Sequence, residues 1–134
     1  MEKHFKLTDE TINHDGHTLH RIQATRDLPK HNVKMGDLGG YVEYEDNLQD
    51  EAWIFDNAKA YERSVVSGRA VLRCAARAFG WARIYENAIV GDRALVYNEA
   101  EVCGNAVIND CVEIYGRARI CGNIQIYGLA RIFE

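Results

Sequence analysis

From Asp50 to Phe133 the chain repeats every six residues without an insertion or a deletion. This stretch forms 14 hexads, from DEAWIF and DNAKAY at the start to GNIQIY and GLARIF at the end. A period this short indicates a parallel β-helix, in which stacked coils bury one continuous core. The repeat leaves no room for a loop that could close a pocket. We therefore expect function at a face, an end or a subunit interface.

The third and fifth hexad positions define the predicted core. Position 5 is aliphatic except at Ala60 and Ala78, and position 3 is alanine in 11 of the 14 hexads. Residues two apart share one face of a strand, so these two positions point to the same side. Positions 1 and 2 carry turn residues such as Gly-Asn and Asp-Arg. Each hexad is thus predicted to be a short strand followed by a corner, because an amphipathic helix would need an apolar spacing near 3.6.

Composition narrows the class of protein. The chain has 134 residues, which fits a single domain, and its net charge of −4 makes extended nucleic acid an unlikely partner. Pro29, the only proline, precedes the repeat, where it removes no hydrogen bond from a strand ladder. No segment approaches the length of a membrane span, and the N-terminus lacks the apolar run of a signal peptide. We expect a cytoplasmic protein without a membrane partner.

Residues 1–40 are predicted to form an N-terminal cap made of a hairpin and a loop, and residues 41–134 the β-helix. Two strands flank Asn13-His14-Asp15-Gly16, in which Asp-Gly is the turn signal. Val42 and Leu48 already fall on position 5 when the register is run backwards. A solenoid end needs a cap because its apolar axis and strand edges are otherwise exposed. The sequence leaves open whether this segment covers its own solenoid or a neighbour's.

Two resemblances sharpen the fold. An aliphatic residue followed four positions later by a small one, as in Ile84 and Ala88, resembles the hexapeptide repeat of left-handed β-helices, in which three hexads make one triangular coil. Residues 19–133 also resemble a family of hexapeptide-repeat proteins from bacteria and temperate phages. The shared motif is Gly-Asp-x-Gly-Gly-aromatic-Val-acid, here Gly36 to Glu43. The predicted fold is therefore an all-β, single-domain, left-handed parallel β-helix.

Members of the resembled family are often labelled acyltransferases, but a fold does not specify an activity. The resemblance implies a histidine on a coil as general base, at an interface between two subunits. The last histidine of this chain is His31, so the repeat contains none. Glu86 and Asp92 could replace it in principle, yet both occupy corner positions where acids are ordinary turn residues. We expect a non-catalytic protein without a cofactor and keep acyl transfer as an alternative.

Histidines and cysteines offer two further candidate sites. The spacing of His14, His17 and His20 is not that of a common zinc motif, and strand alternation separates His17 from His20, so we predict no metal site. Cys103 and Cys121 are one coil apart and close enough for a disulfide. Because a cytoplasmic protein keeps its thiols reduced, we expect both to be free.

Aligning every third hexad of the sequence places outward side chains in columns on three faces. Position 4 of the first face is apolar where a solvent face should be polar, and we predict an oligomer interface there: Trp53, Val71, Ile89, Val107. The second face has an aromatic column at position 6 beside basic residues, and we predict either structural stacking or a binding face: Lys59, Tyr61, Arg77, Phe79, Tyr97, Tyr115, Arg131, Phe133. The third face is more polar.

The function predicted from these columns is that of an oligomeric interaction protein. The resemblance favours a homotrimer, because left-handed β-helices of this superfamily typically trimerise. The frequency of the resembled family in temperate phages suggests a counter-defence role, such as an anti-CRISPR or other anti-defence inhibitor. Such a protein would bind a host protein or sequester a small nucleotide. A structural scaffold is the second alternative to acyl transfer.

Overall fold

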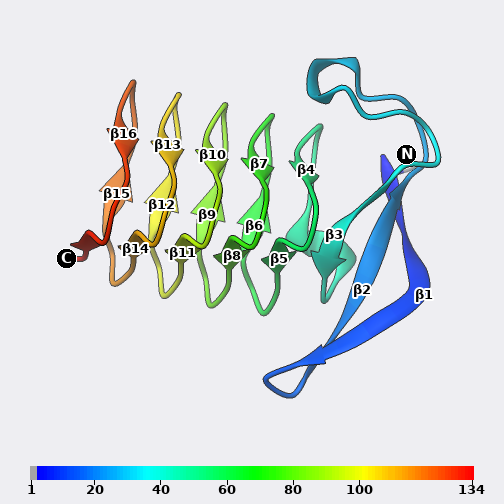
Figure 1. Ribbon diagram of the computed structural model, residues 1–134, viewed down its shortest axis with the longest axis horizontal. Helices are drawn as coiled ribbons and strands as arrows, with labels where there is room; N and C mark the ends of the chain where they lie inside the picture. Colours follow the sequence, from blue (N-terminus) through cyan, green and yellow to red (C-terminus); the bar gives the residue numbers. More distant parts are fainter. Residues whose placement is uncertain (1–2) are drawn as a thin grey trace.

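The computed structural model describes residues 3–134, which form a single β-solenoid preceded by a long hairpin and a loop (Figure 1). The chain begins with two long strands, β1 (Phe5–His14) and β2 (His17–Ala24), followed by the 3-10 turn η1 (Pro29–His31). The strand β3 (Leu38–Val42) and the turn η2 (Glu45–Asn47) lead into the repeat. The all-β prediction is confirmed.

Each hexad contributes one two-residue strand at positions 4 and 5, and every third strand belongs to the same sheet. The first face contains β4 (Trp53–Ile54), β7 (Val71–Leu72), β10 (Ile89–Val90), β13 (Val107–Ile108) and β16 (Gln125–Ile126). The second face contains β5 (Lys59–Ala60), β8 (Arg77–Ala78), β11 (Leu95–Val96), β14 (Glu113–Ile114) and β17 (Arg131–Ile132). The third face contains β6 (Val65–Val66), β9 (Arg83–Ile84), β12 (Glu101–Val102) and β15 (Arg119–Ile120).

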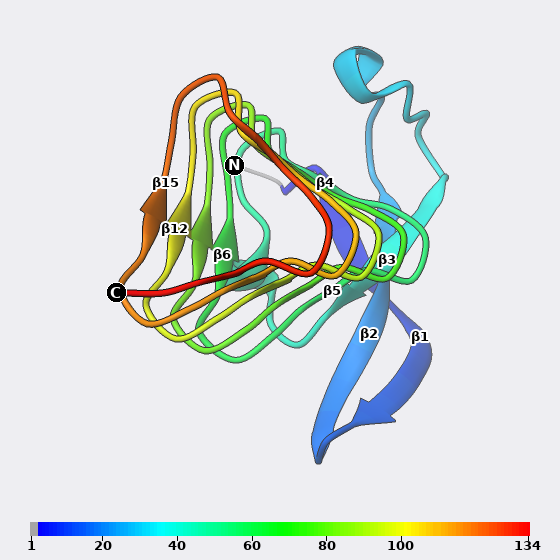
Figure 2. The same ribbon diagram turned by 60° about the vertical axis from the view of Figure 1, so that its left-hand side comes forward.

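All repeat strands pair in parallel with the strand three hexads away, as Ile89 does with Val71 and Val107. Seen from the C-terminal end, the coils form a triangular prism, and the chain runs clockwise as it approaches the viewer (Figure 2). This sense of winding is left-handed. The predicted handedness and the coil of three hexads are therefore confirmed.

The three corners of each coil share one backbone conformation. The position-1 residue of every hexad has a positive φ, from 53° at Asp92 to 93° at Gly122. Glycine, asparagine and aspartate tolerate this left-handed conformation best, which explains their frequency at position 1. We call the corner between the first and second faces the first corner (56–57, 74–75, 92–93, 110–111, 128–129). The second corner (62–63, 80–81, 98–99, 116–117) joins the second and third faces, and the third corner (50–51, 68–69, 86–87, 104–105, 122–123) closes the coil.

The core is the column of position-3 and position-5 side chains along the solenoid axis. From Ala52 to Ile114 these side chains are fully buried, with Ser64 as the one polar member. The Ser64 hydroxyl lies 2.9 Å from the carbonyl oxygen of Tyr61 and 3.0 Å from that of Ala78. In the last coil the equivalent residues Ile120, Ile126 and Ile132 are only partly buried. A continuous apolar stack thus holds the coils together.

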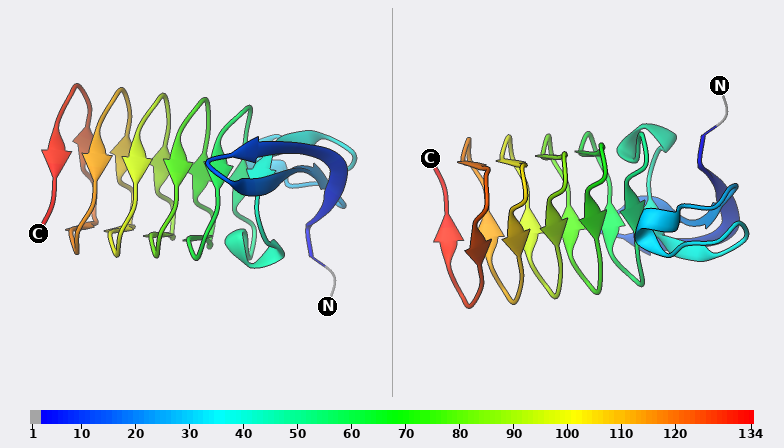
Figure 3. Two further views of the ribbon diagram at one scale, coloured as in Figure 1. Left: turned by 90° about the horizontal axis from the view of Figure 1, so that it is seen from below. Right: turned by 90° about the horizontal axis from the view of Figure 1, so that it is seen from above.

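The N-terminal segment caps its own solenoid (Figure 3). The predicted hairpin is present, and its turn places Asp15 at φ 51° and Gly16 at φ 84°. β2 pairs antiparallel with β3, and β3 pairs in parallel with β5, so the hairpin extends the sheet of the second face. The loop after β2 adds Leu28 and Val33 to the core cluster around Trp53. Together they cover the strand edges at this end of the prism.

The motif that carries the family resemblance forms the junction between cap and solenoid. A Cβ atom on Gly39 would lie 2.5 Å from the carbonyl oxygen of Ile54, and one on Gly40 would overlap the carbonyl oxygen of Ala58. Only glycine permits this backbone approach. The Asp37 carboxylate accepts a hydrogen bond from the backbone N–H of Lys34, 2.9 Å away. β3 spans the predicted boundary at residue 40, and the motif residues have structural roles there.

Candidate interaction surfaces

The apolar column of the first face is open to solvent over only part of its length. Trp53 is 1 % exposed and Val71 is 8 % exposed, whereas Ile89 and Val107 are half-buried. Trp53 packs beneath the cap, where the ring of His4 lies 6.1 Å from the indole. The expectation that all four side chains face solvent is therefore wrong for Trp53 and Val71. For Ile89 and Val107 the oligomer interface stays a prediction.

The aromatic column of the second face is a continuous ladder. The rings of Tyr61, Phe79, Tyr97, Tyr115 and Phe133 are stacked with successive centroids 5.2, 4.9, 5.2 and 5.1 Å apart and planes within 17° of parallel. Aromatic pairs at this separation and angle are offset-stacked, so each ring covers the face of the next. The stacking predicted from the sequence is present. The faces of the inner rings are consequently occupied by their neighbours.

The two ends of this ladder differ. Tyr61 is buried by the hairpin, with the rings of His14 and His17 centred 5.3 and 5.5 Å from it. Phe133 is 65 % exposed and its outer ring face has no neighbour within the described residues. Among the rings of the ladder, Phe133 is therefore the one on which a nucleobase could stack. The ladder offers a partner mainly ring edges and hydroxyl groups.

Basic residues beside the ladder are already engaged at its N-terminal end. Arg77 donates to Nε2 of His14 at 2.8 Å, and its guanidinium lies 5.6 Å from the Phe79 ring centroid. Lys59 donates to the carbonyl oxygen of Asn57, and burial lowers the pKa of its amine. Arg131 pairs with Glu113 at 3.6 Å and remains exposed. Of the predicted binding face, the Arg131 and Phe133 end is the most accessible part.

Tyr97 is the most perturbed titratable group of the second face. Its hydroxyl donates to Oε1 of Glu113 at 2.9 Å. Burial and the hydrogen bond to Glu113 raise the pKa of Tyr97 to about 12. The phenol stays protonated at neutral pH. It therefore acts here as a hydrogen-bond donor and not as a base.

The acids considered as catalytic bases serve the corners. Glu86 accepts a hydrogen bond from the backbone N–H of Gly104 at 3.0 Å, and Asp92 accepts one from that of Asp110 at 2.9 Å. Asp50, Asp56, Glu62 and Asp110 bond the next coil in the same way. Each carboxylate satisfies a backbone donor that the left-handed corner leaves without a ladder partner. This geometry explains both acids as structural turn residues.

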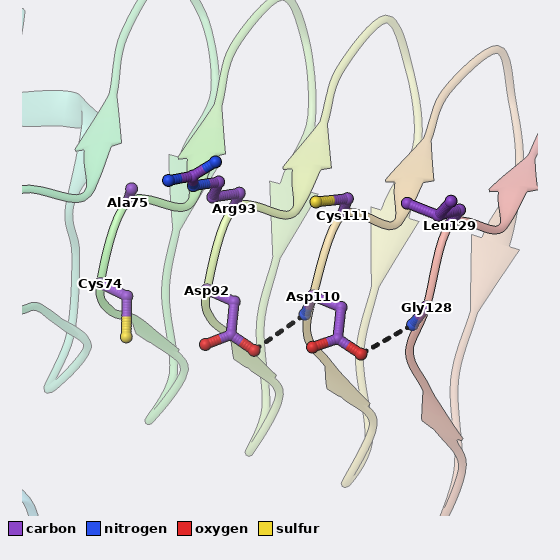
Figure 4. A pocket seen from close by; sticks show the side chains of 8 residues that line it. All are labelled: Cys74, Ala75, Asp92, Arg93, Asp110, Cys111, Gly128 and Leu129. Carbon is purple, nitrogen blue, oxygen red and sulfur yellow. Dashed lines mark hydrogen bonds between the residues drawn. The ribbon is translucent and has the colours of Figure 1, made fainter.

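A shallow groove of about 600 Å³ runs along the first corner (Figure 4). One side is formed by the position-1 row, in which Asp92 and Asp110 are tied to the next coil. The other side is the position-2 row, and three of its four members are small or apolar: Ala75, Arg93, Cys111, Leu129. Leu129 is 82 % exposed. The first corner thus combines apolar surface with a lone cation.

The second corner carries Trp81, which the sequence columns did not single out. This side chain is 60 % exposed, and the guanidinium of Arg63 lies 5.2 Å from its ring. Hollows of about 390 and 710 Å³ flank it, one toward Arg83 and Glu101 and the other toward Gly116 and Glu134. The sequence could have identified Trp81, because a tryptophan is unusual at hexad position 2, which is otherwise mostly polar.

The histidines of the hairpin have separate partners. Nδ1 of His17 lies 2.9 Å from Glu43, and Glu62 lies 3.5 Å from Nε2, so the hydrogen bond to Glu43 raises the pKa of His17. Burial lowers the pKa of His14, and Nδ1 of His20 lies 3.4 Å from the carbonyl oxygen of Thr8. No group of three metal-ligating side chains is placed to hold an ion in residues 3–134.

Cys103 and Cys121 form a disulfide across neighbouring coils of the third face, with Cα atoms 4.5 Å apart. The expectation of free thiols is corrected by this pairing. It follows from the in-register pairing of β12 with β15, which stacks equivalent side chains directly on one another. Cys74 and Cys111 are free and exposed.

Comparison with known proteins adds no assignment. No family model matches the chain, and no curated protein is significantly similar to it. In the described part of the chain, no helix has the length and apolar character needed to cross a membrane.

Proposed function

We propose that the protein is a non-catalytic, self-associating interaction protein that works through the outer surfaces of its solenoid. One observation carries this proposal, the concentration of apolar side chains around the first corner. Ile89 and Val107 lie on the first face before this corner, Leu95 on the second face after it, and Leu129 on the corner itself. The aromatic ladder lies at the far edge of the second face, beside the second corner. Apolar surface gathered on one side of a rigid prism is typical of an interface.

Acyl transfer is less well supported by the same surfaces. The candidate bases Glu86 and Asp92 are engaged with backbone donors, and the groove at the first corner is lined by no histidine. General base catalysis needs a group that can accept a proton within hydrogen-bond reach of the reacting atom. A rigid surface suits assembly or protein binding better. The scaffold function would use the same contacts.

A host protein fits the remaining accessible surface better than a nucleotide. The inner rings of the ladder are stacked on one another, so their faces are closed to a base. Ring edges, hydroxyl groups and Arg131 can instead contact a protein surface. The phage-associated, counter-defence role implied by the family resemblance, together with the cytoplasmic location expected from the sequence, would make that partner a protein of the host.

The self-association is tested by native mass spectrometry of the purified chain and of Ile89→Glu and Val107→Glu. We expect the wild type to be an oligomer, with a homotrimer as the specific expectation, and each variant to be mostly monomeric. A buried carboxylate in an apolar contact opposes association. The matched control is Val65→Glu, which changes the same hexad position on the polar third face. A monomeric wild type at tens of micromolar, or variants that keep the native mass, would overturn the proposal.

A further inference from the structure

The position-2 residues at the first corner differ in shape and polarity from those at the second corner, and this difference suggests how two copies could contact each other. Position 2 lies at the solvent-facing corner and is mostly polar, with four apolar exceptions that are all exposed: Ala75, Trp81, Cys111, Leu129. Three of them share the first corner and line its groove. The fourth, Trp81, projects from the second corner. A hollow and a protruding aromatic side chain thus lie on adjacent corners.

The groove at the first corner has firm walls. The carboxylates of Asp92 and Asp110 are each held 2.9 Å from a backbone N–H of the next coil (Figure 4). Arg93 lies beside Asp92 on the position-2 side, between Ala75 and Cys111, and it makes no ion pair within the described residues. The groove therefore offers one mainly apolar side, one side with carboxylates, and one available cation.

The ridge at the second corner is equally rigid. Trp81 is fixed on a left-handed corner whose preceding residue, Gly80, has φ 67°, and Arg63 stacks on its ring. Beyond it follow Glu99 and Arg117, which form an exposed ion pair 3.7 Å apart. The hairpin contacts this corner at Glu62, so the ridge from Trp81 onward lies beyond the cap. Exposed tryptophans held in place in this way are typical anchors of protein interfaces.

The heights of the two corners along the axis can be compared directly. One coil rises by about 4.8 Å, so each hexad advances the chain by about 1.6 Å. If two copies lie parallel at the same height, a residue of the second corner meets the residue six positions earlier on the neighbour's first corner. Trp81 then meets Ala75, Glu99 meets Arg93, and Arg117 meets Cys111 beside Asp110. The aromatic side chain enters the groove, and opposite charges face each other at two levels.

We infer that a second copy of this chain docks its Trp81 ridge into the first-corner groove, with the two solenoids parallel and in register. The contact is heterologous, because different surfaces of the two copies meet, and it closes a ring when the rotation between copies allows. Burial of the indole supplies the apolar contact. The pair Arg93 with Glu99 of the next copy fixes the register, since a shift by one coil would oppose Arg93 to Arg117 or Trp81. This inference rests on the proposed self-association.

A charge exchange tests the register. Arg93→Glu and Glu99→Arg are each expected to lower the self-association constant at least tenfold in sedimentation velocity, because like charges then meet at the contact. The double variant with both changes is expected to recover most of the wild-type association. Arg69→Glu, a reversal of an exposed ion-paired arginine on the third corner, is the matched control and is expected to associate as the wild type does. Circular dichroism and thermal unfolding verify that each variant is folded.

Trp81→Ala gives an independent measure of the ridge. We expect loss of association without loss of thermal stability, since the side chain is exposed in the single chain. An oligomeric wild type whose mass is unaffected by Trp81→Ala, or whose charge exchange brings no recovery, would overturn this contact while the proposed self-association stands. A wild type that remains monomeric at all concentrations would overturn both.

Discussion

The axial side chains are apolar at both ends of the prism, but they are covered at the N-terminal end and partly exposed in the last described coil. At the N-terminal end, Trp53 and Leu48 are covered by the cap, and the hairpin continues the second-face sheet by hydrogen bonds. In the last described coil Ile120, Ile126 and Ile132 are only partly buried, and Phe133 is 65 % exposed. The hexad sequence is nearly the same in both places. The comparison shows that a repeat specifies which side chains face the axis, whereas burial of the terminal ones depends on what packs against them.

The largest expected effect is loss of the cap. Gly40→Ala would bring a methyl group into the carbonyl oxygen of Ala58, which also accepts the hydrogen bond from the backbone N–H of Tyr41. We expect a loss of about 3 kcal/mol or more in the free energy of unfolding, measured by urea denaturation. In a Trp81→Phe background, Trp53 fluorescence should shift to the red as the cap separates.

The control for this change is Gly91→Ala on the first face. The nearest atoms to its added methyl group would belong to the side chains of Asn109 and Arg73, which can move. A loss below about 1 kcal/mol is expected there. Equal losses at both glycines would show that the close backbone approach at the junction is not what makes Gly40 necessary.

A matched pair of axial truncations compares the covered axis with the last coil. Ile84→Ala removes a fully buried side chain in the middle of the stack, and we expect a loss of about 2–5 kcal/mol. Ile132→Ala removes the same atoms where they are only partly buried, and we expect a loss below about 1 kcal/mol. Urea denaturation of the monomeric protein measures both. Similar losses would mean that the last coil is covered in solution.

The smallest expected effect is a pH dependence of the cap. The hydrogen bond to Glu43 raises the pKa of His17, with opposition from burial and further support from the charges of Glu62 and Asp15. Stabilisation by protonated His17 is therefore full below its ordinary pKa near 6.5 and is lost as the pH rises through the raised value. The melting temperature of the wild type should exceed that of His17→Gln most at low pH, and the difference should vanish on the alkaline side.

The other cap histidines have the opposite effect on the pH dependence of stability. Their contributions cancel when the wild type is compared with His17→Gln. Burial lowers the pKa values of His4, His14 and His31, so their contributions are present above about pH 6.5 and are lost as the pH falls. Both proteins in the comparison share these groups. A difference in melting temperature that stays constant from about pH 5.5 to 8.5 would rule out the ion pair of His17 as the cause.

Much of the fold could be predicted because the hexad places a small residue, an aliphatic residue and a turn residue at fixed intervals. Ile84 and Ala88 face the axis, Asp92 turns a corner, and the columns of the three faces follow from the coil of three hexads. The stacked ladder from Tyr61 to Phe133 follows from the same spacing. The exposed position-2 tryptophan, Trp81, was equally visible in the register. These features follow a register that recurs in every hexad, so the residues of a single strand and its corner are enough to predict them.

Contacts between distant segments could not be predicted in this way. The burial of Trp53 beneath the cap, the fit of Gly39 and Gly40 against Ile54 and Ala58, and the bond of Glu43 to His17 all join parts of the chain that have no common period. The 18-residue spacing predicted that Cys103 and Cys121 lie close together, but it did not predict whether the two thiols are oxidised to a disulfide. The sequence by itself determined the coil, its core and its columns, because short-range sterics and hydrophobic spacing act within each hexad. Only the tertiary structure decided which parts of those columns remain open to a partner, because burial depends on how the non-repeating cap packs over them.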